Sequence, residues 1–412
     1  MIDGFDKMLA GSLKLNEPWY IEGAEFDPEN AEIHIHVGIR DRASFVCPVC
    51  GAAAKRYGYE TEERLWRHAD CLFYPCYVHC RRPKVLCDKC GVVQVNAPFE
   101  RKNSRFTLMF EGYAMLIMAD VPRAKAARLL RCNEKSLTSI LSYWVNDAAG
   151  KLDLSDVCSI AIDETAFKRG HKYVTIAIDA DKRRVFDVEE GREKAAVVAV
   201  GAKLIKQGGD PDNITAVTSD MSSSFLPAVK KCFPNAEQVI DKFHVKQMLI
   251  KAMDDVRKQE QKSVKDKKTL YVSRRLFMVP IGRMDDTQIE QVITLSKMYP
   301  KTGRAFRIVQ SLDAFYAASN REEGEELFAR IYSWMRRCRL EPMKDAAASL
   351  MRHRDLILNY FTNRLTNAIC EGINSMIQAA KRKARGYHTF EGYASMIYLI
   401  AGKLKLAVPS PL

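Results

Sequence analysis

The most informative alternation of apolar and polar residues lies in residues 158–179, which read CSIAIDETAFKRGHKYVTIAID. Two apolar runs are joined by a basic turn, and a third run follows; after it, apolar runs alternate with segments of helical period. We expect five strands, at residues 159–163, 173–179, 183–189, 214–220 and 236–241. The predicted order of elements is β-β-β-α-β-α-β-α.

All five predicted strands end on an acidic residue, and three of these acids, Asp163, Asp220 and Asp241, lie in the motifs discussed below. Burying an unpaired carboxylate is costly, so each acid needs a compensating environment. A plain turn, a salt-bridged surface and a divalent metal site would each supply one. Asp220 would also serve as the N-cap of the next helix, a role that is compatible with metal binding.

A different pattern occupies the N-terminal part, where CPVCG and CDKCG each contain two cysteines in a Cys-x-x-Cys turn. Two such turns complete a tetrahedral four-sulfur site, so we expect one structural Zn²⁺ bound by Cys47, Cys50, Cys87 and Cys90. Redox dithiols are the alternative. The 36 intervening residues contain β-prone stretches and predict a ribbon with a long hairpin. Further possible ligands, read as ordinary strand residues because of their irregular spacing, are His68, Cys71, Cys76, His79 and Cys80.

Helical periodicity begins near Phe106 and continues through two short helices separated by RCN. We expect an apolar stripe on the first helix, formed by Ala126, Ala127, Leu129 and Leu130. The second helix is expected to start at Glu134. Such a pair is typical of a helix-turn-helix, whose second helix enters the DNA major groove, although a plain helical hairpin is the alternative. Its exposed face would contain Lys135, Ser136 and Thr138.

Composition indicates a class of partner. The formal charge of +13 and the pI near 9.1 favour a polyanion, most simply nucleic acid. Twelve cysteines without an export signal argue against a disulfide framework. We expect a soluble, cytoplasmic protein of two to four domains, with no membrane segment.

The positive charge is concentrated near the C-terminus, in TNRLTNAICEGINSMIQAAKRKARGY. A helix here would present Glu371 to a metal site, with Asn374 one turn further on. Its later turns carry four basic residues that would neutralise DNA phosphates: Lys381, Arg382, Lys383 and Arg385.

Together, the motifs IDE at 162–164, SDM at 219–221, DKFHV at 241–245 and the stretch at 366–387 resemble one family. The chain is similar to bacterial insertion-sequence transposases of the Asp-Asp-Glu class, in particular the ISL-three group. The resemblance spans about residues 47–400. It implies an N-terminal zinc ribbon and helix-turn-helix, then an α/β RNase H-like core interrupted by an all-helical insertion.

In that fold the first and fourth strands are adjacent. The resemblance therefore implies a catalytic triad of Asp163, Asp220 and Glu371 that holds two Mg²⁺ (or Mn²⁺) ions, with Asp241, His244 and Asn374 as accessory residues. The implied reaction is cleavage of DNA to free a 3′-hydroxyl, followed by joining of that end to target DNA. The implied partners are double-stranded DNA, as terminal inverted repeats and target, and a second subunit in a homodimer on DNA.

The resulting multidomain organisation has six parts. They are an N-terminal segment (1–40), a zinc ribbon (41–100), a helix-turn-helix module (101–150), the first part of the core (151–258), a helical insertion (259–355) and the last part of the core (356–412). Two other functions remain open at this point. One is a DNA-binding regulator without catalysis, and the other is an RNase H-like nuclease or resolvase that cuts without joining.

Overall fold

The computed structural model describes residues 3–168, 172–191, 193–221, 225–363 and 368–408. These residues form two compact units. The first contains Met1–Gly150, Ala379–Ile400 and Leu404–Leu412, and the second contains Lys151–Gln378 and Ala401–Lys403. Most of the predicted basic turn after Lys168 lies outside the described residues.

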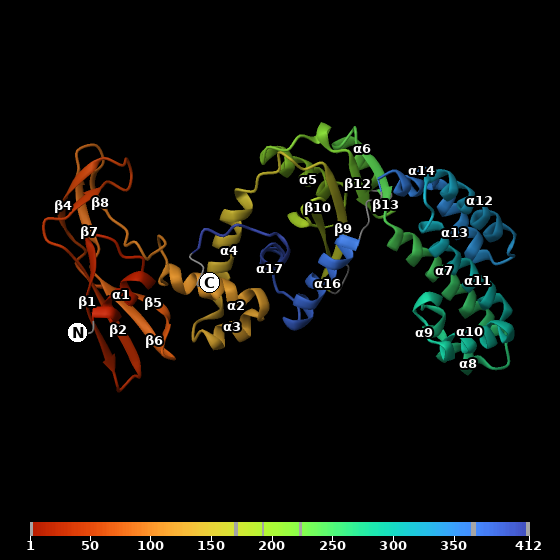
Figure 1. The fold of residues 1–412 in the computed structure, drawn as a ribbon, viewed down its shortest axis with the longest axis horizontal. Coiled ribbons are helices and arrows are strands. Elements are labelled where there is room, and N and C mark those ends of the chain that lie inside the picture. The colour runs from red at the N-terminus through yellow and green to blue at the C-terminus, as the bar shows by residue number, and fades with distance from the viewer. Residues whose placement is uncertain (1–2, 169–171, 192, 222–224, 364–367, 409–412) are drawn as a thin grey trace. The chain divides into compact units, whose positions relative to one another are not determined.

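Two four-stranded sheets form most of the first 100 residues, in the orders β1-β2-β6-β5 and β3-β4-β7-β8 (Figure 1). Helix α1 (Asp3–Ser12) precedes them. The strands are β1 (Trp19–Asp27), β2 (Glu32–Ile39), β3 (Ser44–Val46), β4 (Ala53–Tyr59), β5 (Arg64–Cys71), β6 (Tyr74–Cys80), β7 (Pro83–Cys87) and β8 (Gly91–Gln94). The interval between the two cysteine pairs therefore consists of strands, as predicted. Within it, β6 also pairs in parallel with β2 from the N-terminal segment.

The first unit continues with helices α2 (Leu108–Asp120), α3 (Arg123–Leu129) and α4 (Glu134–Gly150), and it contains α17 (Phe390–Ala401). The predicted start at Glu134 is confirmed. Ala126, Ala127 and Leu130 are buried, but Leu129 is 54% exposed, so its assignment to the apolar stripe was wrong. At 100° per residue, Leu129 lies about 100° from Leu130 and about 160° from Ala127, beyond the edge of the stripe.

A five-stranded mixed sheet forms the start of the second unit, with the order β11-β10-β9-β12-β13 (Figure 1). Its strands are β9 (Ser159–Lys168), β10 (Lys172–Asp179), β11 (Arg184–Glu190), β12 (Ala216–Ser219) and β13 (Glu237–Ile240). The helices that connect or follow these strands are α5 (Lys194–Lys206), the 3₁₀ turn η1 (Pro211–Asn213), α6 (Phe225–Cys232) and α7 (Lys242–Ser263). The predicted element order is confirmed. The first and fourth of these strands, β9 and β12, are parallel neighbours, also as predicted.

The remainder of the second unit is helical. Its elements are α8 (Lys267–Val272), α9 (Arg274–Phe277), η2 (Ile281–Arg283), α10 (Asp286–Met298), α11 (Pro300–Tyr316), α12 (Arg321–Arg337), α13 (Glu341–Arg352), α14 (Arg354–Leu358) and α15 (Tyr360–Asn363). It also contains α16 (Ala368–Lys383) as far as Gln378, and the last turn of that helix belongs to the first unit. Helix α7 packs against α11 and α13, and the apolar cluster of these helices includes Phe306 and Phe315. In the described part of the chain, every helix is too short or too polar to cross a lipid bilayer.

Candidate active site and zinc centre

Asp163 lies in the middle of β9 and not at its end, which corrects the prediction from the sequence. The strand continues to Lys168 because its antiparallel pairing with β10 extends that far. What ends near Asp163 is the pairing with β12, whose last registered pair is Thr218 with Ala161. Beyond this point β9 pairs with β10 alone among the described strands, and a different element contacts it.

Helix α16 contacts β9 at this position through two side-chain hydrogen bonds. The Asn374 amide donates to Oδ2 of Asp163, and the Gln378 amide donates to Oγ1 of Thr165. The two donors are one helical turn apart, and the two acceptors lie on the same face of the strand. Residues more than 200 positions apart in sequence are thereby held together.

The carboxylate of Asp163 is well enclosed. Its Oδ1 accepts a hydrogen bond of 2.7 Å from the Glu164 backbone N–H. Burial raises the pKa of Asp163 above its ordinary value, although the Glu164 hydrogen bond and the nearby His244 imidazole oppose this effect. The site therefore contains a carboxylate that has been partly removed from water.

Asp241 and His244 form a second hydrogen-bonded pair beside this acid. Asp241 follows β13, is 4% exposed and caps α7 by accepting a 2.8 Å hydrogen bond from the Phe243 N–H. Its other oxygen lies 3.0 Å from Nδ1 of His244. Burial alone would lower the pKa of His244, but this hydrogen bond and the charges of Asp241, Asp163 and Asp220 raise it. His244 thus contacts Asp241 directly and is also within the electrostatic influence of Asp163 and Asp220.

Glu371 lies in the first turn of α16, one turn before Asn374, and its side chain is exposed. Its neighbour Cys370 is buried, and burial together with the charges of Asp163, Asp241 and Glu371 raises the pKa of that thiol. The structure thus brings the accessory residues Asp241, His244 and Asn374 to Asp163. Among the described residues, however, Asp163, Asp220 and Glu371 are not one of the groups whose ligand atoms all lie within 4.8 Å.

The side chains around Asp163 are suited to a hard divalent cation. Carboxylate and amide oxygens are the protein ligands that Mg²⁺ prefers, and it keeps several waters, so it does not need a closed cage. Oδ1 of Asn374 is buried and has no hydrogen-bond partner among the described residues. A buried amide oxygen without a partner is costly, and a cation or its bound water would satisfy it.

The four predicted zinc ligands do come together. The sulfur atoms of Cys47, Cys50, Cys87 and Cys90 all lie within 4.8 Å of one another. One pair sits in the turn between β3 and β4, and the other in the turn between β7 and β8. Each turn is completed by a glycine with positive φ, Gly51 at 72° and Gly91 at 73°.

The thiols of this centre differ in acidity, because their contact with one another raises the pKa of Cys90 to about 12, whereas local backbone hydrogen bonds favour the thiolate form of Cys47. Backbone N–H groups of Cys50 and Val49 lower the pKa of Cys47 to about 7. In contrast, burial raises the pKa of Cys76 and of Cys80 to about 12, as expected for thiols that pack as core residues. The latter two cysteines are fully buried in the core of the first unit, in agreement with their interpretation as strand residues.

The remaining alternative ligands have different surroundings. His68 is buried and lies 2.9 Å from Oγ1 of Thr107, the residue that caps α2. Cys71 is partly exposed at the end of β5. His79 belongs to a separate group with His36 and Glu63, two residues that the sequence reasoning missed.

The predicted DNA-binding side chains are mostly accessible. Lys135 is exposed on the first turn of α4, and Ser136 and Thr138 are partly exposed. Thr138 donates its hydroxyl to the Glu134 carbonyl at 2.9 Å. At the end of α16 the exposed cations are Arg382, Lys383 and Arg385, whereas Lys381 is partly buried, which lowers its pKa.

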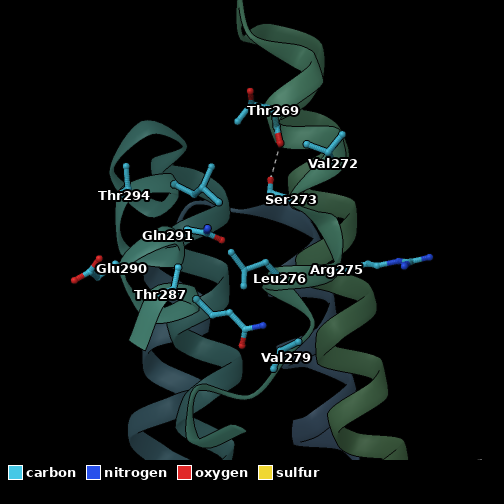
Figure 2. Close-up of a pocket in the computed structure, with 12 residues that line it drawn as sticks. Thr269, Val272, Ser273, Arg275, Leu276, Val279, Thr287, Glu290, Gln291 and Thr294 are labelled. Carbon is cyan, nitrogen blue, oxygen red and sulfur yellow. Dashed lines mark hydrogen bonds between the residues drawn. The ribbon is translucent and has the colours of Figure 1, made fainter. Parts of the chain in front are cut away.

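A separate groove of about 860 Å³ lies in the helical part of the second unit. Figure 2 shows it between α8–α9 and α10, with Leu276 and Val279 on one wall and Thr287 and Gln291 on the other. None of the predicted catalytic or accessory residues lines it. The groove is therefore not part of the candidate active site.

Comparison with known proteins assigns the chain to a class. A family model described as "Transposase", of the ISL3 group, matches residues 160–397, and one described as "zinc-finger of transposase IS204/IS1001/IS1096/IS1165" matches residues 43–90. The first match covers more than half of the chain. The protein therefore belongs to the ISL3 family of insertion-sequence transposases, and its ribbon is a zinc-binding domain.

Two curated relatives align over almost their whole length. The chain is 23% identical over 427 residues to the transposase for insertion sequence element IS1557 of Mycobacterium tuberculosis (strain CDC 1551 / Oshkosh), covering 95% of each protein. It is 22% identical over 397 residues to the transposase for insertion sequence element IS1001 of Bordetella parapertussis, covering 94% of this chain and 96% of the relative.

Proposed function

We propose that this protein binds the terminal inverted repeats of its insertion sequence, cleaves the DNA to free 3′-hydroxyl ends and joins these ends to target DNA. The metal-binding carboxylates would be Asp163, Asp220 and Glu371, in a core of the RNase H-like type. The observation that carries the proposal is the hydrogen bond from Asn374 to the enclosed carboxylate of Asp163. Asn374 belongs to α16, the helix that also contains Glu371. A strand order of β11-β10-β9-β12-β13 is consistent with that core.

Two divalent metal ions, when bound, would activate the attacking oxygen and stabilise the leaving oxygen of the phosphodiester. The chain's own residues prepare the site for them. Asp163 supplies a desolvated negative charge, and Asn374 fixes its orientation. The contact between Asp241 and Nδ1 of His244 fixes the orientation of the imidazole ring, and so it also fixes the direction in which Nε2 points. Because the charges of Asp241, Asp163 and Asp220 act on this imidazole, it would offset part of their mutual repulsion before cations bind.

Two basic surfaces are proposed to contact DNA. Arg382 is eleven residues after Glu371 and lies on the same side of α16 by helical periodicity, whereas Lys381 lies about 80° around the helix. Lys383 points away from that side. We propose that this side follows the phosphate backbone toward the cleaved bond. The exposed first turn of α4, with Lys135, Ser136 and Thr138, is proposed as the recognition helix of a helix-turn-helix.

The decisive experiment is cleavage of a labelled duplex that spans one end of the protein's own insertion sequence. Wild type, Asp163→Asn and Glu164→Gln would be compared in Mg²⁺, Mn²⁺ and EDTA. We expect metal-dependent cuts that leave a 3′-hydroxyl, and a loss of at least about 10³-fold in Asp163→Asn because a metal ligand is lost. Glu164→Gln is the matched control, since it removes the neighbouring acid and should leave cutting largely intact.

Three outcomes would contradict the proposal. Cutting that persists in Asp163→Asn would mean that the metal-binding carboxylate has been misassigned. Folded, DNA-bound wild type that cuts in neither metal would favour a regulator without catalysis. If cutting occurs but added target DNA is never joined, the protein is a nuclease and not a strand-transfer enzyme.

A further inference from the structure

The outer face of the first sheet contains a group of histidines that neither the zinc ribbon nor the proposed active site uses. On β2 the residues alternate, with Ile33, Ile35 and Val37 facing the core, so His34 and His36 face outward. Parallel pairing of β2 with β6 sets His36 directly beside His79. The sheet itself thus brings these imidazoles together.

Distances within this group are short. Nδ1 of His79 lies 3.0 Å from Oε2 of Glu63, and Nε2 of His79 lies 2.9 Å from Nδ1 of His34. The rings of His36 and His79 stack with centroids 4.7 Å apart. One ligand atom from each of His36, Glu63 and His79 lies within 4.8 Å of the others. No other group of described residues besides the four cysteines meets this criterion.

These residues also have the chemistry of a transition-metal site. Ligand atoms that share a tetrahedral zinc ion at its usual bond lengths lie about 3.3 Å apart. The distance between Nδ1 of His79 and Oε2 of Glu63, 3.0 Å, is close to this value. Imidazole nitrogen selects Zn²⁺ over Mg²⁺, and a carboxylate can complete such a set. The His79 side chain is only 19% exposed and His34 is 20% exposed, so little side-chain motion would be needed to hold them in place.

We propose that His36, His79 and Glu63 bind a second zinc ion, distinct from that of the ribbon, with His34 holding the His79 ring in place through its other nitrogen. The ion would join β2 and β6 to the segment just before β5. It would therefore fasten the N-terminal residues to the rest of the sheet. This site is independent of the catalytic proposal, because its residues lie on the sheet β1-β2-β6-β5.

The test measures zinc bound per chain in the full-length protein, by elemental analysis after removal of loosely bound metal. Excess Mg²⁺ is kept present so that the acidic site does not take up zinc. Wild type should retain two zinc ions, and the double variant His36→Gln/His79→Gln should retain one. Glu63→Gln should weaken the second site by more than about tenfold in a chelator competition. Glu62→Gln and His353→Gln are the matched controls and should retain two.

A second readout separates lost metal from lost folding. Far-UV circular dichroism should show that the variants are folded, and Co²⁺ substitution should give nitrogen–oxygen bands in wild type in addition to the cysteine bands of the ribbon. In the double variant only the cysteine bands should remain. Wild type with a single zinc ion and cysteine bands alone would overturn the proposal, as would a folded double variant that still binds two.

Discussion

The enclosed carboxylate of Asp163 depends on its immediate neighbours for stability. A backbone N–H and the Asn374 amide satisfy one oxygen each, yet burial still raises its pKa. At the residue scale the site is therefore held in shape by neutral hydrogen-bond donors and not by a permanent salt bridge. Such an arrangement leaves the negative charge available to a cation.

Substitution of Asn374 tests this arrangement directly. Asn374→Ala removes the donor to Asp163, and we expect the free energy of unfolding to fall by about 1 kcal/mol. The Mg²⁺ concentration needed for half-maximal cleavage should rise, since the carboxylate is no longer oriented. Ser375→Ala, on the exposed neighbouring position, is the control. Unchanged Mg²⁺ dependence in Asn374→Ala would show that the amide has no part in orienting the acid.

A pH effect is expected from a different acid, Glu189 on β11. Burial, together with the charge of Asp187, raises the pKa of Glu189 to about 7. A carboxyl group with a raised pKa favours folding while protonated, and this contribution disappears as the pH rises through the folded pKa. Glu189→Gln should therefore stabilise the protein above pH 7, by roughly 1 kcal/mol after solvent screening.

Below about pH 4.5, where Glu189 is protonated in both states, the difference between the two proteins should vanish. Urea unfolding of wild type and variant at pH 4.5, 6 and 8.5 gives the comparison. Glu190→Gln, at the exposed next position, should show no such pH dependence. An equal effect at all three pH values would contradict the assigned cause.

At the scale of elements, the sheet β3-β4-β7-β8 has short strands, of which β3 has three residues and β8 has four. Sheets of this size bury little apolar surface, so bound metal accounts for much of their stability. The two cysteine turns lie at one end of these strands and join both hairpins through one ion.

Loss of the ribbon zinc should unfold this sheet locally. In Cys87→Ser we expect the backbone amides of β3, β4, β7 and β8 to lose most of their hydrogen-exchange protection, because one of four ligands is gone. Strands β9 to β13 should be unaffected. Cys158→Ser, which changes an exposed cysteine elsewhere, is the control. Retained protection in a zinc-free Cys87→Ser protein would mean that the sheet is stable without metal.

Helix α16 makes a second prediction at this scale. Arg382 shares a side of the helix with Glu371, whereas Lys383 does not. Arg382→Gln should therefore weaken DNA binding and lower the slope of log K against log salt by about one. Lys383→Gln should change the slope less. Fluorescence anisotropy with an end-repeat duplex at several salt concentrations measures both, and equal slopes for the two variants would refute the assigned side.

For the whole molecule, much could be predicted from local sequence. The element order of the second sheet follows from period-two and helical patterns, and the four zinc ligands follow from the spacing within Cys47–Cys50 and Cys87–Cys90. Features that depend on the pairing of distant strands could not be predicted from local sequence. The extension of β9 beyond Asp163 depends on its register with β10, and the His36–His79 contact depends on the parallel pairing of β2 and β6. The hydrophobic pattern of a strand sets which face is buried, but it does not identify the distant strand that β2 pairs with.

A last prediction concerns assembly. Each chain has one Asp163, and transposition joins two ends of an element, so we propose that two subunits act together on DNA. When wild type is mixed with an equal amount of Asp163→Asn before DNA is added, random pairing leaves about one quarter of the pairs fully wild type. Joining of paired ends should fall to that fraction if both subunits must be active, whereas independently acting monomers would retain about half. Light scattering of the DNA complex measures the subunit number separately, and a single subunit per paired-end complex would exclude the dimer.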